Sequence, residues 1–189
     1  MKQRLLYGKE GLEITLPDNV RVDVVEPKYE EGLPDQIGVA RRALEDPIDS
    51  PPLVDVVEEG MKVGIVLNDI TRATPYHVML PPLVEILESK GAELVFLNAT
   101  GTHRTNTDEE LTAILGEEIF GKYPIVQNEC LDEDSHTYIG TTSRGNEVRI
   151  HSTLLECDLK ILTGFIEPHF FAGYSGGGKA MMPGLAQLS

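Results

Sequence analysis

The sequence predicts an α/β fold: an open, mostly parallel, Rossmann-like sheet with helices on both faces, preceded by an N-terminal β-hairpin. Two observations predict the sheet. From residue 62 onward, a short apolar run, a polar loop and a segment of helical periodicity recur in that order, which is the pattern of parallel strands joined by helices. The apolar runs are continuous rather than alternating, as is typical of strands buried on both faces.

Composition and charge indicate a globular chain with an acidic surface. Hydrophobic residues make up 41% and charged residues 25% of the 189 residues. The net charge of −15 argues against nucleic-acid binding, which needs a basic surface. No apolar run is long enough to cross a membrane, and the two cysteines match no metal-ligand spacing. We therefore expect a cytoplasmic protein with a small-molecule ligand.

The first 60 residues are expected to form a hairpin and two helices. Residues 12–16 and 20–24 alternate apolar and polar side chains on either side of a Pro-Asp-Asn turn, which is typical of a β-hairpin. Residues 36–44 have apolar side chains at helical spacing. Ser50 before two prolines indicates the N-cap of a second helix that ends at Gly60.

The remaining elements follow the strand–loop–helix order. Thr107 and Glu110 have the spacing of a capping box and predict the start of a helix. Helices are also expected at residues 76–89 and 152–158, and a hairpin at residues 138–150. The expected sheet strands are residues 62–67, 92–97, 124–127 and 159–162.

Polar side chains follow three of these strands, in loops 68–75, 98–106 and 164–184. The carboxyl ends of parallel strands meet at one edge of a sheet, where α/β proteins bind their ligands. We therefore expect one site that gathers Asp69, Thr71, Arg72, Thr100, His103, Arg104, Glu167, His169, Ser175 and Lys179.

The third loop contains a glycine-rich stretch, residues 173–178, that ends at Lys179. Glycines let backbone N–H groups approach an anion closely, and the lysine adds a charge or a nucleophilic amine. The spacing resembles a P-loop, but Ala180 replaces the hydroxyl residue that binds Mg²⁺. The sequence therefore argues against a nucleoside triphosphatase. A glycine-rich turn with a solvated lysine is the structural alternative.

Two histidines near a carboxylate clamp suit racemisation or epimerisation, which needs a proton-transfer group on each face of a stereocentre. Each residue also has a structural alternative. Arg72 could pair with Asp69, His103 could cap the helix that begins after Thr107, and His169 could pack against its neighbouring phenylalanines. His77, His136 and His151 lie outside the strand-end loops, and we interpret them as structural.

Three motifs resemble the lactate racemase family, the nickel-pincer-nucleotide-dependent racemases and epimerases of 2-hydroxy acids. The motifs are Asp69-x-Thr71-Arg72, then Ala99-Thr100-Gly101-x-His103-Arg104, and the long stretch from Gly164 through Glu167, His169, Ser175 and Lys179 to Gly184. They occur over most of the chain. Ile70, Ala73 and Gly178 depart from the commonest pattern, and these departures bear on the identity of the substrate.

The resemblance implies a role for each motif residue. His103 and His169 are implied as the catalytic acid/base pair, and Arg72 as the ligand of the substrate carboxylate. Lys179 is implied to carry the nickel-pincer nucleotide covalently through a thioamide. The implied reaction passes through a 2-keto acid, with the α-hydrogen moving as hydride. The other implied cofactor-binding residues are Asp69, Thr71, Ser175, Gly176 and Gly177.

The resemblance also implies a domain organisation. Residues 1–189 are expected to form the N-terminal, cofactor-carrying α/β domain, without the second α/β domain of the family. The nickel-binding histidine is expected beyond Ser189, so no metal ligand is assigned within this chain and the chain alone is expected to be inactive. The alternative from another class is a non-catalytic phosphate- or nucleotide-binding module that uses Lys179 reversibly.

Overall fold

A computed structural model describes residues 1–26 and 28–188. The chain divides into two compact units, Met1–Gly32 and Leu33–Ser189. The first unit contains an antiparallel hairpin of β1 (Lys2–Leu5) and β2 (Leu12–Thr15). An N-terminal hairpin is thereby confirmed.

The strand predicted at residues 20–24 is wrong, because β1 rather than this segment pairs with β2. The turn lies instead between β1 and β2, where Gly8 and Gly11 adopt positive φ angles of 59° and 74° that favour glycine. Asp18, in the expected turn, lies 3.0 Å from the ammonium group of Met1. This contact holds the loop against the start of β1.

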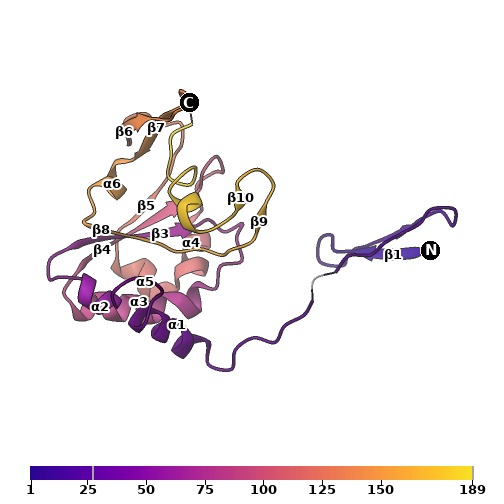
Figure 1. Cartoon of the computed structure of the whole chain (residues 1–189), viewed down its shortest axis with the longest axis horizontal. Coiled ribbons are helices and arrows are strands. Elements are labelled where there is room, and N and C mark those ends of the chain that lie inside the picture. Colours follow the sequence, from indigo (N-terminus) through magenta and orange to yellow (C-terminus); the bar gives the residue numbers. More distant parts are fainter. Residues whose placement is uncertain (27, 189) are drawn as a thin grey trace. The chain divides into compact units, whose positions relative to one another are not determined.

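The second unit is built on a four-stranded parallel sheet (Figure 1). Its strands are β3 (Lys62–Asn68), β4 (Glu93–Ala99), β5 (Ile125–Gln127) and β8 (Leu159–Leu162), in the order β5-β4-β3-β8. All neighbouring pairs are parallel. This order is that of the first four strands of a Rossmann fold, so the predicted fold class is confirmed.

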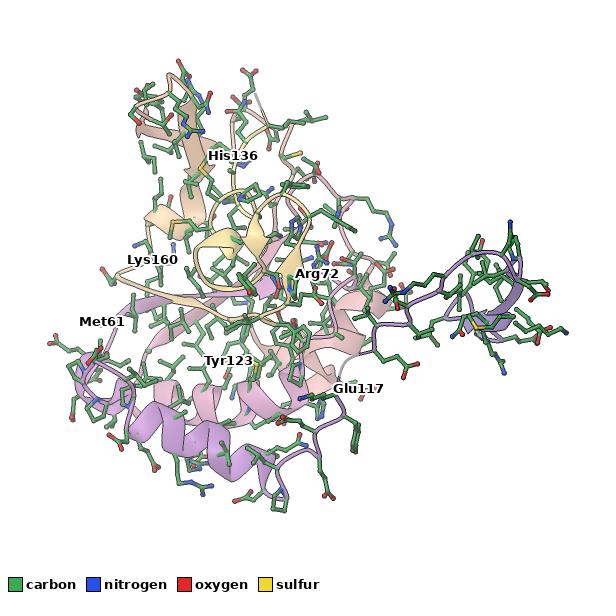
Figure 2. The ribbon with its side chains drawn as sticks, turned by 45° about the vertical axis from the view of Figure 1, so that its right-hand side comes forward. Met61, Arg72, Glu117, Tyr123, His136 and Lys160 are labelled. Carbon is green, nitrogen blue, oxygen red and sulfur yellow. The ribbon has the colours of Figure 1, made fainter. Side chains whose placement is uncertain are left out.

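Helices cover one face of this sheet (Figure 1). Leu80, Leu83 and Leu87 of α3 (Tyr76–Ser89) pack on the side chains of β3 and β4. Tyr123, labelled in Figure 2, packs its ring 5.6 Å from that of Phe96. The expected N-cap at Ser50 is wrong, because α2 (Leu53–Val56) has Pro52 at that position, and this helix ends at Val56 rather than at Gly60. The helices on this face are α1 (Gln36–Glu45), α2 (Leu53–Val56), α3 (Tyr76–Ser89), α4 (Asp108–Leu115) and α5 (Glu117–Lys122).

Shorter elements cover the opposite face of the sheet. Leu154 and Ile150 pack there against Val66 and Leu97. Gly64 permits this close approach, since a Cβ at its position would lie 2.9 Å from the Cys157 sulfur. The elements on this face are β6 (His136–Thr141), β7 (Glu147–His151), α6 (Ser152–Leu155) and the 3₁₀ turn η1 (Gly177–Ala180).

The strand order reverses at β3, whose neighbours β4 and β8 belong to opposite halves of the sheet. Such a switch point leaves a crevice beyond the carboxyl ends of the strands. The chain after β8 enters this region through a small ladder of β9 (Pro168–His169) and β10 (Gly173–Tyr174). None of the helices in residues 1–26 and 28–188 has the length and apolar character needed to cross a bilayer.

Candidate active site

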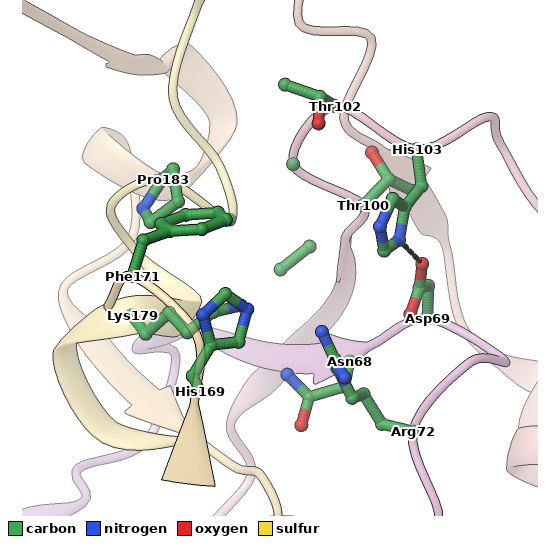
Figure 3. A pocket seen from close by; sticks show the side chains of 13 residues that line it. Asn68, Asp69, Arg72, Thr100, Thr102, His103, His169, Phe171, Lys179 and Pro183 are labelled. Carbon is green, nitrogen blue, oxygen red and sulfur yellow. Dashed lines mark hydrogen bonds and ion pairs between the residues drawn. The ribbon is translucent and has the colours of Figure 1, made fainter. Parts of the chain in front are cut away.

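The loops after β3, β4 and β8 surround one cavity of about 70 Å³. Figure 3 shows His169, Lys179 and Phe171 on one side of it and His103 and Asp69 on the other. Three segments that are far apart in the sequence therefore converge at the switch point. The lining residues are Asn68, Asp69, Arg72, Ala99, Thr100, Gly101, Thr102, His103, His169, Phe171, Lys179, Pro183 and Gly184.

Asp69 orients the His103 ring. The carboxylate is buried, and its Oδ2 lies 2.5 Å from His103 Nδ1. The Thr71 hydroxyl donates to the other oxygen at 2.6 Å. An ionised carboxylate can only accept, so His103 Nδ1 carries the proton and the neutral ring presents the lone pair of Nε2. His103 therefore does not cap α4, whose capping box Thr107 and Glu110 complete.

His169 has the opposite arrangement. The backbone N–H of Ala172 donates to its Nδ1 at 3.3 Å, so the neutral ring carries its proton on Nε2. Its ring meets that of Phe171 edge to face, with centroids 4.6 Å apart. Partial desolvation and the nearby Lys179 and Arg72 lower the pKa of His169, and Glu167 opposes this shift. The cavity thus has one neutral imidazole with a lone pair at Nε2 and one with an N–H at Nε2.

Arg72 is paired with Glu167 rather than with Asp69. Arg72 Nη1 donates to Glu167 Oε1 at 3.2 Å, which joins the loop after β3 to the loop after β8. The two side chains are 23% and 36% exposed, so this single bond is a weak interaction. The remaining guanidinium N–H groups have no hydrogen-bond partner among the described residues, and Arg72 lines the cavity.

Lys179 lies in η1, and its side chain lines the cavity. Burial and the neighbouring Arg72 lower the pKa of its amine, while Asp69 and Glu167 oppose the shift. A lowered pKa increases the fraction of neutral, nucleophilic amine near neutral pH.

The glycine-rich stretch fixes the position of η1. Gly176 has φ 76° and ψ −175°, a conformation essentially restricted to glycine. The hydroxyl of Ser175 is buried, accepts from the Glu167 backbone N–H at 3.0 Å and donates to the Phe165 carbonyl. Ala180 is 2% exposed and packs in the core below the turn.

The structure brings six of the ten gathered residues to the cavity: Asp69, Arg72, Thr100, His103, His169 and Lys179. Thr71, Glu167 and Ser175 lie behind this lining and hold it in place, and Gly176 and Gly177 shape the loop. Arg104 forms a two-pronged ion pair with Glu110, at 2.8 and 2.7 Å. It therefore stabilises the start of α4.

Sequence reasoning missed Asn68, Phe171, Pro183 and Gly184 as lining residues. The place of Gly184 follows from a backbone bond, since Gly101 N–H donates to its carbonyl at 2.9 Å. A Cβ on Gly184 would lie 2.9 Å from that of Ala99. The sequence signal for this contact was weak, because it consists only of a glycine in each of two loops.

Comparison with known proteins identifies the family. The protein-family model described as lactate racemase N-terminal domain matches residues 7–189. The chain belongs to this family. The resemblance drawn from the three motifs is therefore confirmed.

Two curated relatives of this family member are lactate racemases. It is 35% identical over 187 residues to the protein from Thermoanaerobacterium thermosaccharolyticum and 39% identical over 147 residues to that from Lactiplantibacillus plantarum. These alignments cover 96% and 77% of the chain, but 44% and 35% of the relatives. The chain thus spans less than half the length of the relatives that it matches.

One solved structure supports the same assignment, and a second shares the fold. The lactate racemase apoprotein from T. thermosaccharolyticum superimposes with a TM-score of 0.86 at 34% identity, covering 99% of this chain and 44% of the other. A crystal structure of a Thermotoga maritima protein gives a TM-score of 0.65 at 27% identity, covering 84% of this chain and 40% of the other.

Proposed function

We propose that this domain is the cofactor-carrying part of a nickel-dependent racemase or epimerase of short 2-hydroxy acids. One observation carries the proposal: two imidazoles, His103 and His169, share a cavity with Arg72 and Lys179. The names of the two curated relatives support the reaction class.

The two histidines supply proton transfer. His103 Nε2 takes the proton from the substrate hydroxyl when the 2-keto acid forms, and Asp69 stabilises the resulting imidazolium. For the opposite enantiomer, His169 takes this role from the other side of the cavity as the tautomer with a free Nε2, for which its Nδ1 gives up the bond from the Ala172 N–H. The lowered pKa of His169 keeps its ring neutral near pH 7.

Arg72 binds the substrate carboxylate. The guanidinium group of Arg72 has five N–H donors, and Glu167 accepts from one of them. The others are available for a two-pronged bond to a carboxylate. Such a bond fixes the orientation of the α-carbon between the two imidazoles.

The residues present fit the implied pincer nucleotide. Lys179 offers an amine of lowered pKa for covalent attachment, and Gly177 and Gly178 leave open space where side chains would stand. A cavity of about 70 Å³ is smaller than the 300–1,000 Å³ typical of ligand pockets, so the nucleotide would extend out of its open side. When bound, the cofactor supplies the acceptor and donor for the α-hydrogen.

The metal ligand is proposed to lie outside this chain. We propose that the nickel-binding histidine follows Ser189 and that the second domain completes the substrate site.

Intact mass tests the cofactor assignment. The chain is produced together with the enzymes that synthesise the pincer nucleotide, and the purified protein is weighed and mapped by peptide fragmentation. We expect a cofactor-sized adduct on Lys179 that disappears in Lys179→Arg and persists in Lys122→Arg, which alters an exposed lysine of α5. Reversible nucleotide binding without an adduct would instead favour the non-catalytic binding module.

A further inference from the structure

Asn68 presents a nearly buried side-chain amide to the cavity. The residue ends β3, directly before Asp69, and is only 7% exposed. It lines the cavity together with both histidines, and in the view of Figure 3 its amide lies close to the Arg72 side chain. A polar group that is largely removed from water needs a hydrogen-bond partner, so the surroundings of this amide indicate what it binds.

Two contacts set the orientation of the amide. The Thr74 hydroxyl donates to Asn68 Oδ1 at 3.2 Å. Gly164 lies against the same oxygen, because a Cβ at Gly164 would be 2.9 Å from it. The Cα hydrogen of Gly164 fits against an oxygen atom but would crowd the hydrogens of a turned NH₂ group. The oxygen of Asn68 therefore faces Thr74 and Gly164, and the NH₂ group points in the remaining direction.

The backbone at Asn68 is held in place as well. Its N–H donates to the hydroxyl of Tyr76, a buried residue at the start of α3. In the parallel ladder of β3 and β4, Asn68 pairs with Ala99. A strand and a helix therefore present the amide to the cavity, and such support preorganises a binding group.

The NH₂ group of Asn68 has no hydrogen-bond partner among residues 1–26 and 28–188. In that part of the chain, Asn98 Oδ1 and Gln187 Oε1 are the side-chain atoms that are both fully covered and without a partner. Asn68 Nδ2 is not one of them, so it remains accessible, and Asn68 lines the cavity. Two N–H donors are therefore available to a ligand there.

The proposed reaction offers one acceptor that suits these donors. With the substrate carboxylate on Arg72, the next carbon carries the hydroxyl oxygen that becomes the ketone oxygen. An amide does not gain or lose protons near neutral pH, so it can donate to this oxygen in the hydroxy acid and in the keto acid alike. Negative charge develops on the ketone oxygen when the α-hydrogen returns as hydride, and a preorganised donor stabilises that charge.

We propose that Asn68 is a further substrate-binding residue, whose NH₂ group donates to the oxygen on carbon 2 of the 2-hydroxy acid and of the corresponding 2-keto acid. This inference rests on the proposed function and adds a determinant of substrate class to it. The amide selects acids with an oxygen on carbon 2 over acids without one. It serves both enantiomers, because they share the same 2-keto acid.

Nuclear magnetic resonance on the chain joined to the proposed second domain tests this role. Pyruvate, D-lactate and L-lactate have an oxygen on carbon 2, whereas propionate has the same carboxylate without that oxygen. We expect pyruvate and both lactates to move the side-chain NH₂ signals of Asn68 in a saturable way. Propionate should move the backbone amide of Arg72 and leave the Asn68 signals in place. Equal movement of the Asn68 signals by propionate and pyruvate, or no movement with pyruvate bound, overturns the inference.

Two variants sharpen the test. Asn68→Ala should lower the affinity for pyruvate relative to that for propionate by about 3- to 10-fold, as expected for the loss of one hydrogen bond. Asn146→Ala, an exposed change between β6 and β7, should leave this ratio unchanged.

The outcomes separate the role of Asn68 from the proposed function. If Asn68→Ala has the circular dichroism spectrum of the parent and an unchanged affinity ratio, Asn68 has no such role and the proposed function stands. If the parent protein binds neither pyruvate nor lactate, the proposed function fails, and the inference about Asn68 fails with it.

Discussion

At the scale of single residues, the candidate site depends on how its charges are distributed. Asp69 and Glu167 each lie against one group of the site, His103 and Arg72 respectively. The sequence placed all four residues at strand ends but left open an Asp69–Arg72 pair. Local sequence could not decide this, because the partner of Arg72 is 95 residues away along the chain.

The lowered pKa of Lys179 predicts its pH-dependent reactivity. Because burial and Arg72 favour the neutral amine, the rate of acylation of Lys179 should reach half its maximum at a lower pH than that of Lys122. The pKa of Lys122 is raised by its bond to Glu88. Mass spectrometry of pulse-labelled protein measures both midpoints in one sample.

Arg72→Gln provides the internal control for this prediction. Removing the guanidinium charge should raise the pKa of Lys179 and move its midpoint to higher pH, and the Lys122 midpoint should stay constant. If the pH midpoint of Lys179 acylation in the parent protein lay at or above that of Lys122, the Lys179 amine would behave as that of an ordinary surface lysine, and the prediction would be wrong.

At the scale of elements, the buried strands and the hairpin of β6 and β7 were predictable, whereas β1, β9 and β10 were not. Residues 62–67 and 92–97 predict β3 and β4 because most of their side chains are apolar and do not alternate with polar ones. The hairpin strand at residues 20–24 was wrongly predicted because alternation alone does not specify a partner. The ladder of β9 and β10 has no apolar pattern, and tertiary bonds such as those of Ser175 hold it.

The glycine-rich stretch offers a matched pair of substitutions. Gly176→Ala forces a side chain into a backbone conformation reserved for glycine, 3.3 Å from Ile166. It should lower the free energy of unfolding by about 1–3 kcal/mol. Gly178→Ala meets no atom within 4 Å and should change it by less than about 0.5 kcal/mol. Urea unfolding followed by circular dichroism measures both, and equal effects would contradict the loop geometry.

At the scale of the whole α/β unit, strand order determines where the candidate site lies. The order β5-β4-β3-β8 places the loops after β3, β4 and β8 around one crevice. The sequence predicted this convergence from the general rule for parallel sheets. It did not give the strand order, because order depends on long-range packing of the apolar side chains on both sheet faces.

The convergence of the two histidines on one substrate site is the central claim, and binding of D- and L-lactate tests it most directly. The ring resonances of His103 and His169 are followed while each enantiomer is added to the chain joined to the proposed second domain, and Arg72→Gln serves as the control. The account predicts that both enantiomers move both histidines with a shared dissociation constant and that Arg72→Gln weakens binding of both. Ring shifts at only one histidine, or the same binding in Arg72→Gln, would contradict it.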